Sequence, residues 1–269
     1  MGVLRLRGVK APAAATASSS LLHGTALRAT IGDGMPDEHA RQVRRMFGRI
    51  VPRYDLLNRL MSLGMDGRWR RAAAAAAQPA DCLALDVGAG TGGLALELRR
   101  QGAAHVVGAD FSSEMLATAG AKAVAARDAG LSWALADTLS LPFPEDTFDC
   151  VTNAFLLRNL ADLRAGLAEM ARVLKPGGRL VCLDATQPPP GLFASLYRLY
   201  FNHLLPPLAG AISGDRAAYR YLPNSLQGFP KATGLAAILA DIGLSDVRFR
   251  LLAGGTVALH TGRRPPIET

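Results

Sequence analysis

From Leu83 onward, short apolar runs alternate with stretches of helical periodicity. Helices are predicted between the runs, near residues 93–101, 113–129 and 162–174. The five runs are CLALDVG, HVVGAD, LSWALAD, FDCVTNAF and GRLVCLDAT. Strands that are apolar throughout and are separated by helices are typical of a parallel sheet covered on both faces. We therefore predict an α/β fold built on a mostly parallel sheet.

The pattern changes after the fifth apolar run. Residues 188–232 break the alternation with three prolines and an aromatic-rich helical stretch, which indicates an insertion. A last helix is predicted at 233–243, followed by the short strands VRFRLLA and TVALHTG. The Gly254-Gly255 pair between these strands favours a hairpin. The predicted sheet therefore has seven strands, and its last two form an antiparallel pair.

The chain before the first strand falls into a tail and a helical region. Helices are predicted at 36–50 and over 54–78, the latter ending at Pro79. Residues 1–32 are rich in Ala, Ser and Thr, basic and free of acids, which is typical of an organelle transit peptide. A start at Met35 in a bacterial chain explains the same tail as a disordered upstream extension. Both interpretations stay open, and we predict a single domain over residues 35–269.

Composition narrows the class of protein. The chain is 49% hydrophobic, so it can bury a sizeable core, and its formal charge is +8. A basic chain is attracted to anionic lipid or to nucleic acid, although such charge often serves solubility alone. The three cysteines lie in or beside apolar runs without close spacing, which indicates reduced core residues and no metal site. No run reaches the ~18 apolar residues of a spanning helix.

The first predicted strand leads into a glycine-rich turn, Gly88-Ala89-Gly90-Thr91-Gly92-Gly93. Glycines let the backbone turn tightly and let a ligand approach the main-chain amides. The spacing also fits the turn of dinucleotide dehydrogenases. Asp110, which ends the next strand, could bind ribose hydroxyls in either class of protein. The turn therefore predicts a Rossmann-like fold but does not decide the cofactor.

Three observations favour S-adenosylmethionine as the cofactor. Asp86 precedes the glycines, where a carboxylate suits a ligand that carries an ammonium and gives nothing to a pyrophosphate. Asp137 and Thr138 end the third strand, where an acid can accept the exocyclic amine of adenine. The run ARVLKPGGRLV places a helix end, a Pro-Gly-Gly turn and a strand in direct succession. Each acid alone could equally cap a helix or lie in solvent.

The motifs together resemble a known family. LDVGAGTGG, GADFSSEML, ALADTLSLPFPEDTFDCV and RVLKPGGRL are similar to the successive motifs of class I S-adenosylmethionine methyltransferases. The more specific blocks resemble the menaquinone/ubiquinone biosynthesis C-methyltransferases, over about residues 36 to 264. These blocks are FGRIVPRYDLLNRLMSLGMDGRWRR, FLLRN, SLYRLYFNHLLPPLAG, YRYLPNS and GGTVALHTG. The sequence departs from that family at four positions: Gly93 (usually an acid), Leu156 (Gly), Asp184 (Glu) and Ala154 (often Ser).

The resemblance implies a site and a reaction. Methyl transfer to a ring carbon of a prenylated quinol is expected, either demethylmenaquinol or its counterpart in the ubiquinone pathway. Another small lipophilic acceptor is the alternative. The expected cofactor-binding residues are Asp86, Gly88, Gly90, Thr91, Asp110, Phe111, Asp137, Thr138, Asn153, Ala154 and Tyr54.

The resemblance also implies residues that act on the quinol. Arg158 and Asn159 are expected to hold the oxygen on which phenolate charge develops, and the alternative is that they cap the following helix. Arg158 is assigned electrostatic stabilisation because its guanidinium stays protonated. His203 and Tyr219, with Tyr221, are acid/base or ring-contact candidates, although His203 could equally be a packed core residue.

Expected partners follow from the substrate. A basic chain with an apolar insertion suits transient contact with a membrane surface, and hence a cytoplasmic enzyme peripheral to the inner membrane face. Mitochondrion or plastid is the alternative if the tail is a transit peptide. A homodimer is left open, and no nucleic-acid partner is expected because the basic residues are dispersed. An NAD(P)-dependent oxidoreductase and an inactive cofactor-binding scaffold are the competing classes.

Overall fold

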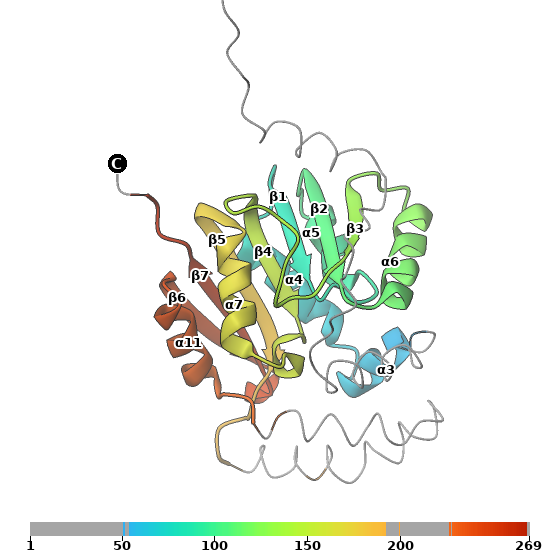
Figure 1. Ribbon diagram of the computed structural model, residues 1–269. Helices are drawn as coiled ribbons and strands as arrows, with labels where there is room; N and C mark the ends of the chain where they lie inside the picture. Colours follow the sequence, from blue (N-terminus) through green and yellow to red (C-terminus); the bar gives the residue numbers. More distant parts are fainter. Residues whose placement is uncertain (1–50, 52–53, 192–198, 200–225, 227, 268–269) are drawn as a thin grey trace, which may run out of the picture.

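A computed structural model describes residues 51, 54–191, 199, 226 and 228–267. Its centre is a seven-stranded sheet with the order β3-β2-β1-β4-β5-β7-β6 (Figure 1). The first five strands run parallel, and β7 is antiparallel to both β5 and β6. The strands are β1 (Leu83–Val87), β2 (His105–Asp110), β3 (Leu131–Leu135), β4 (Phe148–Ala154), β5 (Leu174–Ala185), β6 (Ser245–Leu252) and β7 (Val257–Arg263). The predicted sheet, with its antiparallel last pair, is confirmed.

Helices cover both faces of the sheet, as the continuous apolar runs predict. Along β1, Leu85 and Val87 belong to one buried cluster and Ala84 belongs to the other. One face carries α4 (Asp66–Ala77), α5 (Gly93–Arg100) and α6 (Ser113–Ala125); the other carries α7 (Leu163–Arg172) and α11 (Ala232–Asp241) (Figure 1). Such a sheet is buried from both sides, so alternate residues of each strand pack against different helices.

The helical region predicted over 54–78 consists of two helices. α3 (Tyr54–Met61) ends before a turn in which Leu63 and Gly64 have φ angles of 52° and 77°. Left-handed residues of this kind end a helix, and α4 begins only at Asp66. The helix predicted over 113–129 likewise ends early, at Ala125, with Arg127 at φ 52°. The helix predicted at 36–50 lies outside the described residues.

The Pro-Gly-Gly segment lies inside β5 rather than before it. Leu174 already pairs with Phe148, the register then shifts, and pairing resumes between Cys150 and Arg179. Gly177 has a φ of 77°, which fits the extra residues of a bulge. The segment predicted as a turn therefore interrupts the ladder without ending the strand.

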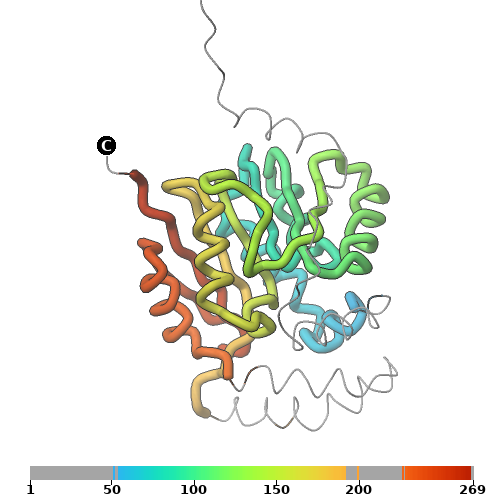
Figure 2. Tube along the Cα trace, in the orientation of Figure 1, coloured from blue at the N-terminus to red at the C-terminus, as the bar shows by residue number. Residues whose placement is uncertain are grey.

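The hairpin of the last two strands lies at the end of the sheet where the chain leaves β5, since a Cβ on Gly255 would be 2.6 Å from Pro189. The predicted hairpin is confirmed, and β6 and β7 are joined by η4 (Ala253–Gly255), whose two glycines have positive φ. Figure 2 shows the chain leaving after β5 and returning before α11 at neighbouring points. Gln187 Nε2 donates to the Leu226 carbonyl at 3.4 Å across these points. Most of the predicted insertion at 188–232 lies outside the described residues.

Candidate cofactor and active site

The glycine-rich turn between β1 and α5 is shaped by left-handed backbone. Gly88, Gly90 and Gly92 have φ angles of 66°, 54° and 79°. The position of a Cβ on Gly88 would lie 2.7 Å from Leu156 Cδ1, so a side chain has no room there. β1 lies between β2 and β4, where the strand order reverses, and ligands of open α/β sheets bind at such points.

Asp110, at the end of β2, fixes this turn. One carboxylate oxygen accepts the Gly90 amide at 2.8 Å, and the other accepts the Ser112 amide at 2.9 Å. Burial raises the pKa of Asp110 to about 6, although these backbone donors act in the opposite direction. The turn is thereby tied to the neighbouring strand. Binding of ribose hydroxyls by Asp110 stays a prediction.

Asp86 is buried beside the same turn, with only 1% of its surface exposed. One oxygen accepts the Thr152 hydroxyl at 3.0 Å, and the other, Oδ2, is buried and has no hydrogen-bond partner among the described residues. Burial raises the pKa of Asp86 to about 7, against the opposing effects of the Thr152 hydrogen bond, the charge of Arg70 and the backbone N–H of Ala95 in the first turn of α5. A buried carboxylate oxygen without a donor suits a cationic ligand group, so the site fits the ammonium of S-adenosylmethionine.

Helix α3 closes over the turn from the outside. Asp55 accepts the Thr91 hydroxyl at 2.7 Å and forms an ion pair with Lys122 of α6. The position of a Cβ on Gly90 would lie 3.9 Å from Tyr54 Cε1, which places the Tyr54 ring at the turn. Burial alone would raise the pKa of Asp55, but the Lys122 and Thr91 hydrogen bonds outweigh it and lower the pKa. The structure thus brings the predicted residues Tyr54, Gly90 and Thr91 together.

The segment after β3 joins this group through the backbone. The Ala136 amide donates to the Asp110 carbonyl at 3.0 Å, so Asp137 and Thr138 lie beside the end of β2. Asp137 Oδ1 accepts the Leu139 amide at 2.9 Å in a tight turn, and Thr138 is buried. Phe111, directly after Asp110, is half-buried. Binding of adenine by these residues stays a prediction.

At the end of β4, the two predicted residues lie on opposite faces of the sheet. Asn153 is fully buried, and its Nδ2 lies 3.1 Å from Cys182 Sγ and 3.4 Å from Met170 Sδ. This side chain therefore faces the core cluster beneath α7. Ala154 is half-buried and packs against the other cluster. Both residues still bring their backbone to the carboxyl edge of the sheet next to β1.

Arg158 follows β4 in η2 (Leu157–Asn159) and is anchored by a buried carboxylate. Its Nη1 lies 2.5 Å from Asp184 Oδ1, and the two side chains are 9% and 2% exposed. Asp184 Oδ2 accepts the Leu157 amide at 2.8 Å. Arg158 Nε is buried without a hydrogen-bond partner among the described residues. The guanidinium is thus held in place and keeps a donor to spare.

The alternative that Arg158 and Asn159 cap the following helix is wrong. Asp162 caps α7, because its Oδ1 accepts the Ala165 amide at 2.9 Å. Asn159 Nδ2 instead donates to the Phe155 carbonyl at 3.2 Å, within the short turn that carries Arg158. His203, Tyr219 and Tyr221, the other catalytic candidates, lie outside the described residues.

Phe155 and Arg70 belong to this site and were missed by the sequence reasoning. Phe155 has a left-handed backbone, with φ at 61°, and two guanidinium groups lie close to its ring. Arg70 Cζ is 6.0 Å and Arg158 Cζ is 5.7 Å from the centre of the ring. Asp184 was noted only as a departure from the family. Two features of the sequence could have indicated these residues, namely the arginines of residues 68–71 (RWRR) and the position of Phe155 directly after β4.

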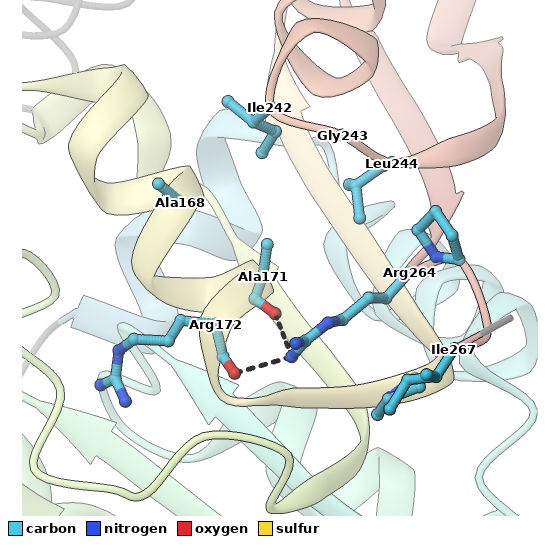
Figure 3. Close-up of a pocket in the computed structure, with 10 residues that line it drawn as sticks. Ala168, Ala171, Arg172, Ile242, Gly243, Leu244, Arg264 and Ile267 are labelled. Carbon is cyan, nitrogen blue, oxygen red and sulfur yellow. Dashed lines mark hydrogen bonds between the residues drawn. The ribbon is translucent and has the colours of Figure 1, made fainter. Parts of the chain in front are cut away.

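A separate hollow of about 420 Å³ lies at the other end of the parallel strands (Figure 3). Its walls come from the end of α7, the segment after α11 and residues 264–267. Arg264 Nη1 donates to the carbonyls of Ala171 and Arg172, at 3.2 and 2.9 Å (Figure 3). This arginine satisfies the free carbonyls at the end of α7 and so has a structural role. The hollow is distinct from the glycine turn.

Among solved structures, similar chains share the fold at low sequence identity. The [4+2]-cyclase SpnF is 20% identical, with a TM-score of 0.61, over 84% of this chain and 96% of the cyclase. A methyltransferase of Thermotoga maritima, described as S-adenosylmethionine-dependent, is 16% identical, with a TM-score of 0.58, over 82% of this chain and 99% of that protein. These likenesses establish a class I methyltransferase-type fold.

The particular family is established by sequence. The chain is 52% identical to a demethylmenaquinone methyltransferase of Thermus thermophilus, over 82% of this chain and all of the relative. It is 45% identical to the corresponding protein of Deinococcus radiodurans and 42% identical to a ubiquinone/menaquinone biosynthesis C-methyltransferase of Geobacter sulfurreducens. These alignments cover 87% and 84% of this chain, and 97% and 90% of the relatives. Residues 35–264 match the ubiE/COQ5 methyltransferase family, and the chain belongs to it.

Proposed function

We propose that this enzyme transfers the methyl group of S-adenosylmethionine to a ring carbon of a prenylated quinol, with demethylmenaquinol as the first candidate. When bound, the cofactor supplies an electrophilic methyl on a sulfonium. The family and the names of the relatives support the reaction. The glycine turn, the unpartnered oxygen of Asp86 and the position of Asp110 support the cofactor.

The observation that carries the proposal is the anchored Arg158. Ring carbons of a quinol become nucleophilic when a neighbouring oxygen carries phenolate charge. Arg158 offers a buried N–H donor whose orientation is fixed by Asp184, so little reorganisation is needed when that charge develops. Leu156, two residues earlier, contacts Gly88, which places this turn directly beside the glycines. We assign Arg158 to the quinol oxygen and Asp184 to the positioning of Arg158.

Methyl transfer from labelled S-adenosylmethionine tests the proposal. Reduced demethylmenaquinone and the reduced demethyl benzoquinone precursor are offered in parallel, and we expect label in the former. Label in the benzoquinol alone would assign the ubiquinone pathway. Label in neither, with S-adenosylhomocysteine still bound, would overturn the quinol and favour another small lipophilic acceptor.

The role of Arg158 is tested with Arg158→Lys. A lysine can still pair with Asp184, which avoids leaving a buried charge alone, but it loses the planar set of donors. We expect kcat to fall roughly 100-fold with little change in the affinity for S-adenosylhomocysteine. An unchanged kcat would remove Arg158 from the reaction.

We also propose that α3 contacts the membrane that holds the substrate. Leu56 and Leu60 are 52% and 37% exposed and lie four residues apart on one face of α3, and Leu63, in the turn that follows the helix, is 72% exposed. The exposed side chains of Arg59 and Arg68 add positive charge nearby. An apolar face flanked by cations suits the surface of an anionic bilayer. Within the described residues, no helix is both long and apolar enough to cross a bilayer.

Vesicle sedimentation tests this surface. We expect binding to vesicles containing phosphatidylglycerol, and loss of binding when Leu56, Leu60 and Leu63 are all replaced by Gln. Val124→Gln is the matched control, since Val124 is 79% exposed on α6. Equal binding of the triple variant and the control would refute the assignment to α3. Homodimer formation and the lack of a nucleic-acid partner stay predictions.

A further inference from the structure

Helix α4 supplies a cation, Arg70, whose charge acts on the carboxyl group of Asp86. Arg70 lies beside the glycine turn, because the position of a Cβ on Gly93 would be 3.1 Å from Arg70 Nε. The same guanidinium lies over the ring of Phe155 at the end of β4. Arg70 therefore spans the two strand ends, β1 and β4, between which the strand order reverses.

The guanidinium is positioned and keeps unused donors. Arg70 Nη1 forms an ion pair with Asp66, one turn earlier on α4, and the two side chains are 17% and 18% exposed. No second acceptor of Arg70 is found in the described part of the chain. Gly93 has no side chain that could compete for it. A planar guanidinium with free N–H groups suits two-point binding of a carboxylate.

The chemistry of the cofactor then restricts what Arg70 can bind. The methionine end of S-adenosylmethionine carries an ammonium and a carboxylate on the same carbon. If the ammonium lies against the buried oxygen of Asp86, the carboxylate must lie within a few ångströms of it. Burial sets the net shift of the Asp86 pKa, which is upward. The positive charge of Arg70 acts in the opposite direction and lowers that pKa. A carboxylate in this place therefore meets a cation.

We propose that Arg70 binds the carboxylate of the methionine part of the cofactor, opposite the ammonium held by Asp86. The assignment rests on the proposed use of S-adenosylmethionine. It makes Arg70 and Asp86 an oppositely charged pair that recognises the two charges of an α-amino acid. It also gives the arginine-rich segment at residues 68–71 (RWRR) a direct role in the cofactor site.

Two ligands separate this role from a structural one. S-adenosylhomocysteine carries both charged groups, whereas its decarboxylated analogue keeps the ammonium and lacks the carboxylate. Affinities are measured by titration calorimetry for the wild type, Arg70→Gln and Arg71→Gln. Arg71 is the matched control, since it is exposed on the same helix and has no ion pair within the described residues.

For wild type and Arg71→Gln we expect S-adenosylhomocysteine to bind roughly 10- to 100-fold more tightly than the analogue. In Arg70→Gln the preference should disappear, because only the affinity for the carboxylate-bearing ligand falls. An equal loss for both ligands would show that Arg70 only shapes the turn and would overturn the assignment. An unchanged preference would overturn it as well.

Failure of the cofactor proposal is recognised separately. A wild-type enzyme that binds neither ligand would refute S-adenosylmethionine itself, and this assignment with it. Arg70→Lys provides a further check, since it keeps the charge and loses the second donor arm. We expect it to retain part of the preference, and a preference as low as in Arg70→Gln would argue against charge recognition.

Discussion

At the scale of single residues, the two buried carboxylates of the site differ in what their oxygens bind. Asp110 receives a backbone N–H on each oxygen and thereby shapes the glycine turn. Asp86 receives one hydroxyl and leaves its second oxygen without a donor among the described residues. An unpaired buried charge costs free energy, so Asp86 favours its protonated form until a cation arrives. The stability of the cofactor-free enzyme should therefore depend on the protonation of Asp86.

The sign of that dependence follows from the direction of the shift. Because the pKa of Asp86 rises from 3.8 to about 7 on folding, the folded chain holds a proton that the unfolded chain releases. The contribution of Asp86 to the free energy of unfolding is fully present below about pH 4 and is lost as the pH rises to about 7. Asp86→Asn removes the titration. The gain in unfolding free energy of Asp86→Asn over wild type should be roughly 2–3 kcal/mol larger at pH 8 than at pH 5.

Urea unfolding of the cofactor-free proteins at the two pH values measures this difference. A gain that is the same at pH 5 and pH 8 would show that Asp86 does not titrate in this range. Adding S-adenosylhomocysteine should reduce the pH dependence of the wild type, because the ammonium of the ligand stabilises the ionised form.

The contact between Gly88 and Leu156 gives a second prediction at this scale. Gly88→Ala places a methyl group on a left-handed residue and against the Leu156 side chain, so we expect a loss of about 2 kcal/mol or more. Leu156→Ala should cost about 2–4 kcal/mol through the cavity that it leaves. The double variant should lose less than the sum, by about 1–2 kcal/mol, because only the steric part is relieved. Additive losses in thermal unfolding would exclude the contact.

The contact between Gly88 and Leu156 could not be predicted from the sequence. The glycines were recognised from their spacing, and Leu156 was recognised as unusual for the family. The two residues are far apart in the chain, and their contact depends on β1 and β4 being neighbours. Arg70, Phe155 and Asp184 were missed for the same reason. Local patterns predict turns and strand ends, but they do not say which side chains meet across them.

At the scale of elements, the segments with one clear period were predicted, and the errors lie at left-handed residues. Leu63 divides the helical region predicted over 54–78 although leucine is a good helix former, because its φ of 52° is imposed by the turn toward α4. The bulge in β5 is a similar case, since Pro-Gly-Gly usually marks a turn. In both places the packing of the elements on either side overrides the local preference.

The docking of α3 is the prediction for this scale. Asp55 is the link from α3 to both the glycine turn and α6, through Thr91 and Lys122. Asp55→Ala should release α3, so amide exchange of residues 54–61 should rise several-fold while exchange in α4 stays unchanged. Glu145→Ala, an exposed acid in the loop before β4, is the control. Unchanged exchange in α3 would mean that Tyr54 and Leu57 hold the helix without Asp55.

The pH dependence of this docking has the opposite sign to that of Asp86. Because the pKa of Asp55 is lowered on folding, its contribution is present above the usual value near 3.8 and is lost as the pH falls further. The release of α3 in wild type should therefore occur only in acid. Exchange rates in α3 are compared with the intrinsic rate at each pH. A relative rate that already rises as the pH falls from 7 to 5 would contradict this link.

At the scale of the whole molecule, the alternation of strands and helices predicted the fold class before any contact was known. Parallel strands joined by right-handed crossovers leave few arrangements, and the observed order places β1 at the point of reversal. The glycine turn follows β1, so the fold itself brings Asp86, Asp110 and the turn after β4 together. The order of the strands was not contained in the local pattern, because it is set by which buried faces pack.

Which cofactor the glycine turn accepts is a property of the whole molecule, because residues from several elements surround the turn. A ligand that binds only the folded state at 100 times its dissociation constant stabilises it by about 2.7 kcal/mol. For a domain of this size that corresponds to a rise in Tm of roughly 5–10 °C. We expect this rise with S-adenosylhomocysteine and none with NADH at the same concentration, because Asp86 and Arg70 suit an amino-acid group and a buried carboxylate repels a pyrophosphate. A rise with NADH instead would favour the oxidoreductase alternative and contradict the proposed methyl transfer.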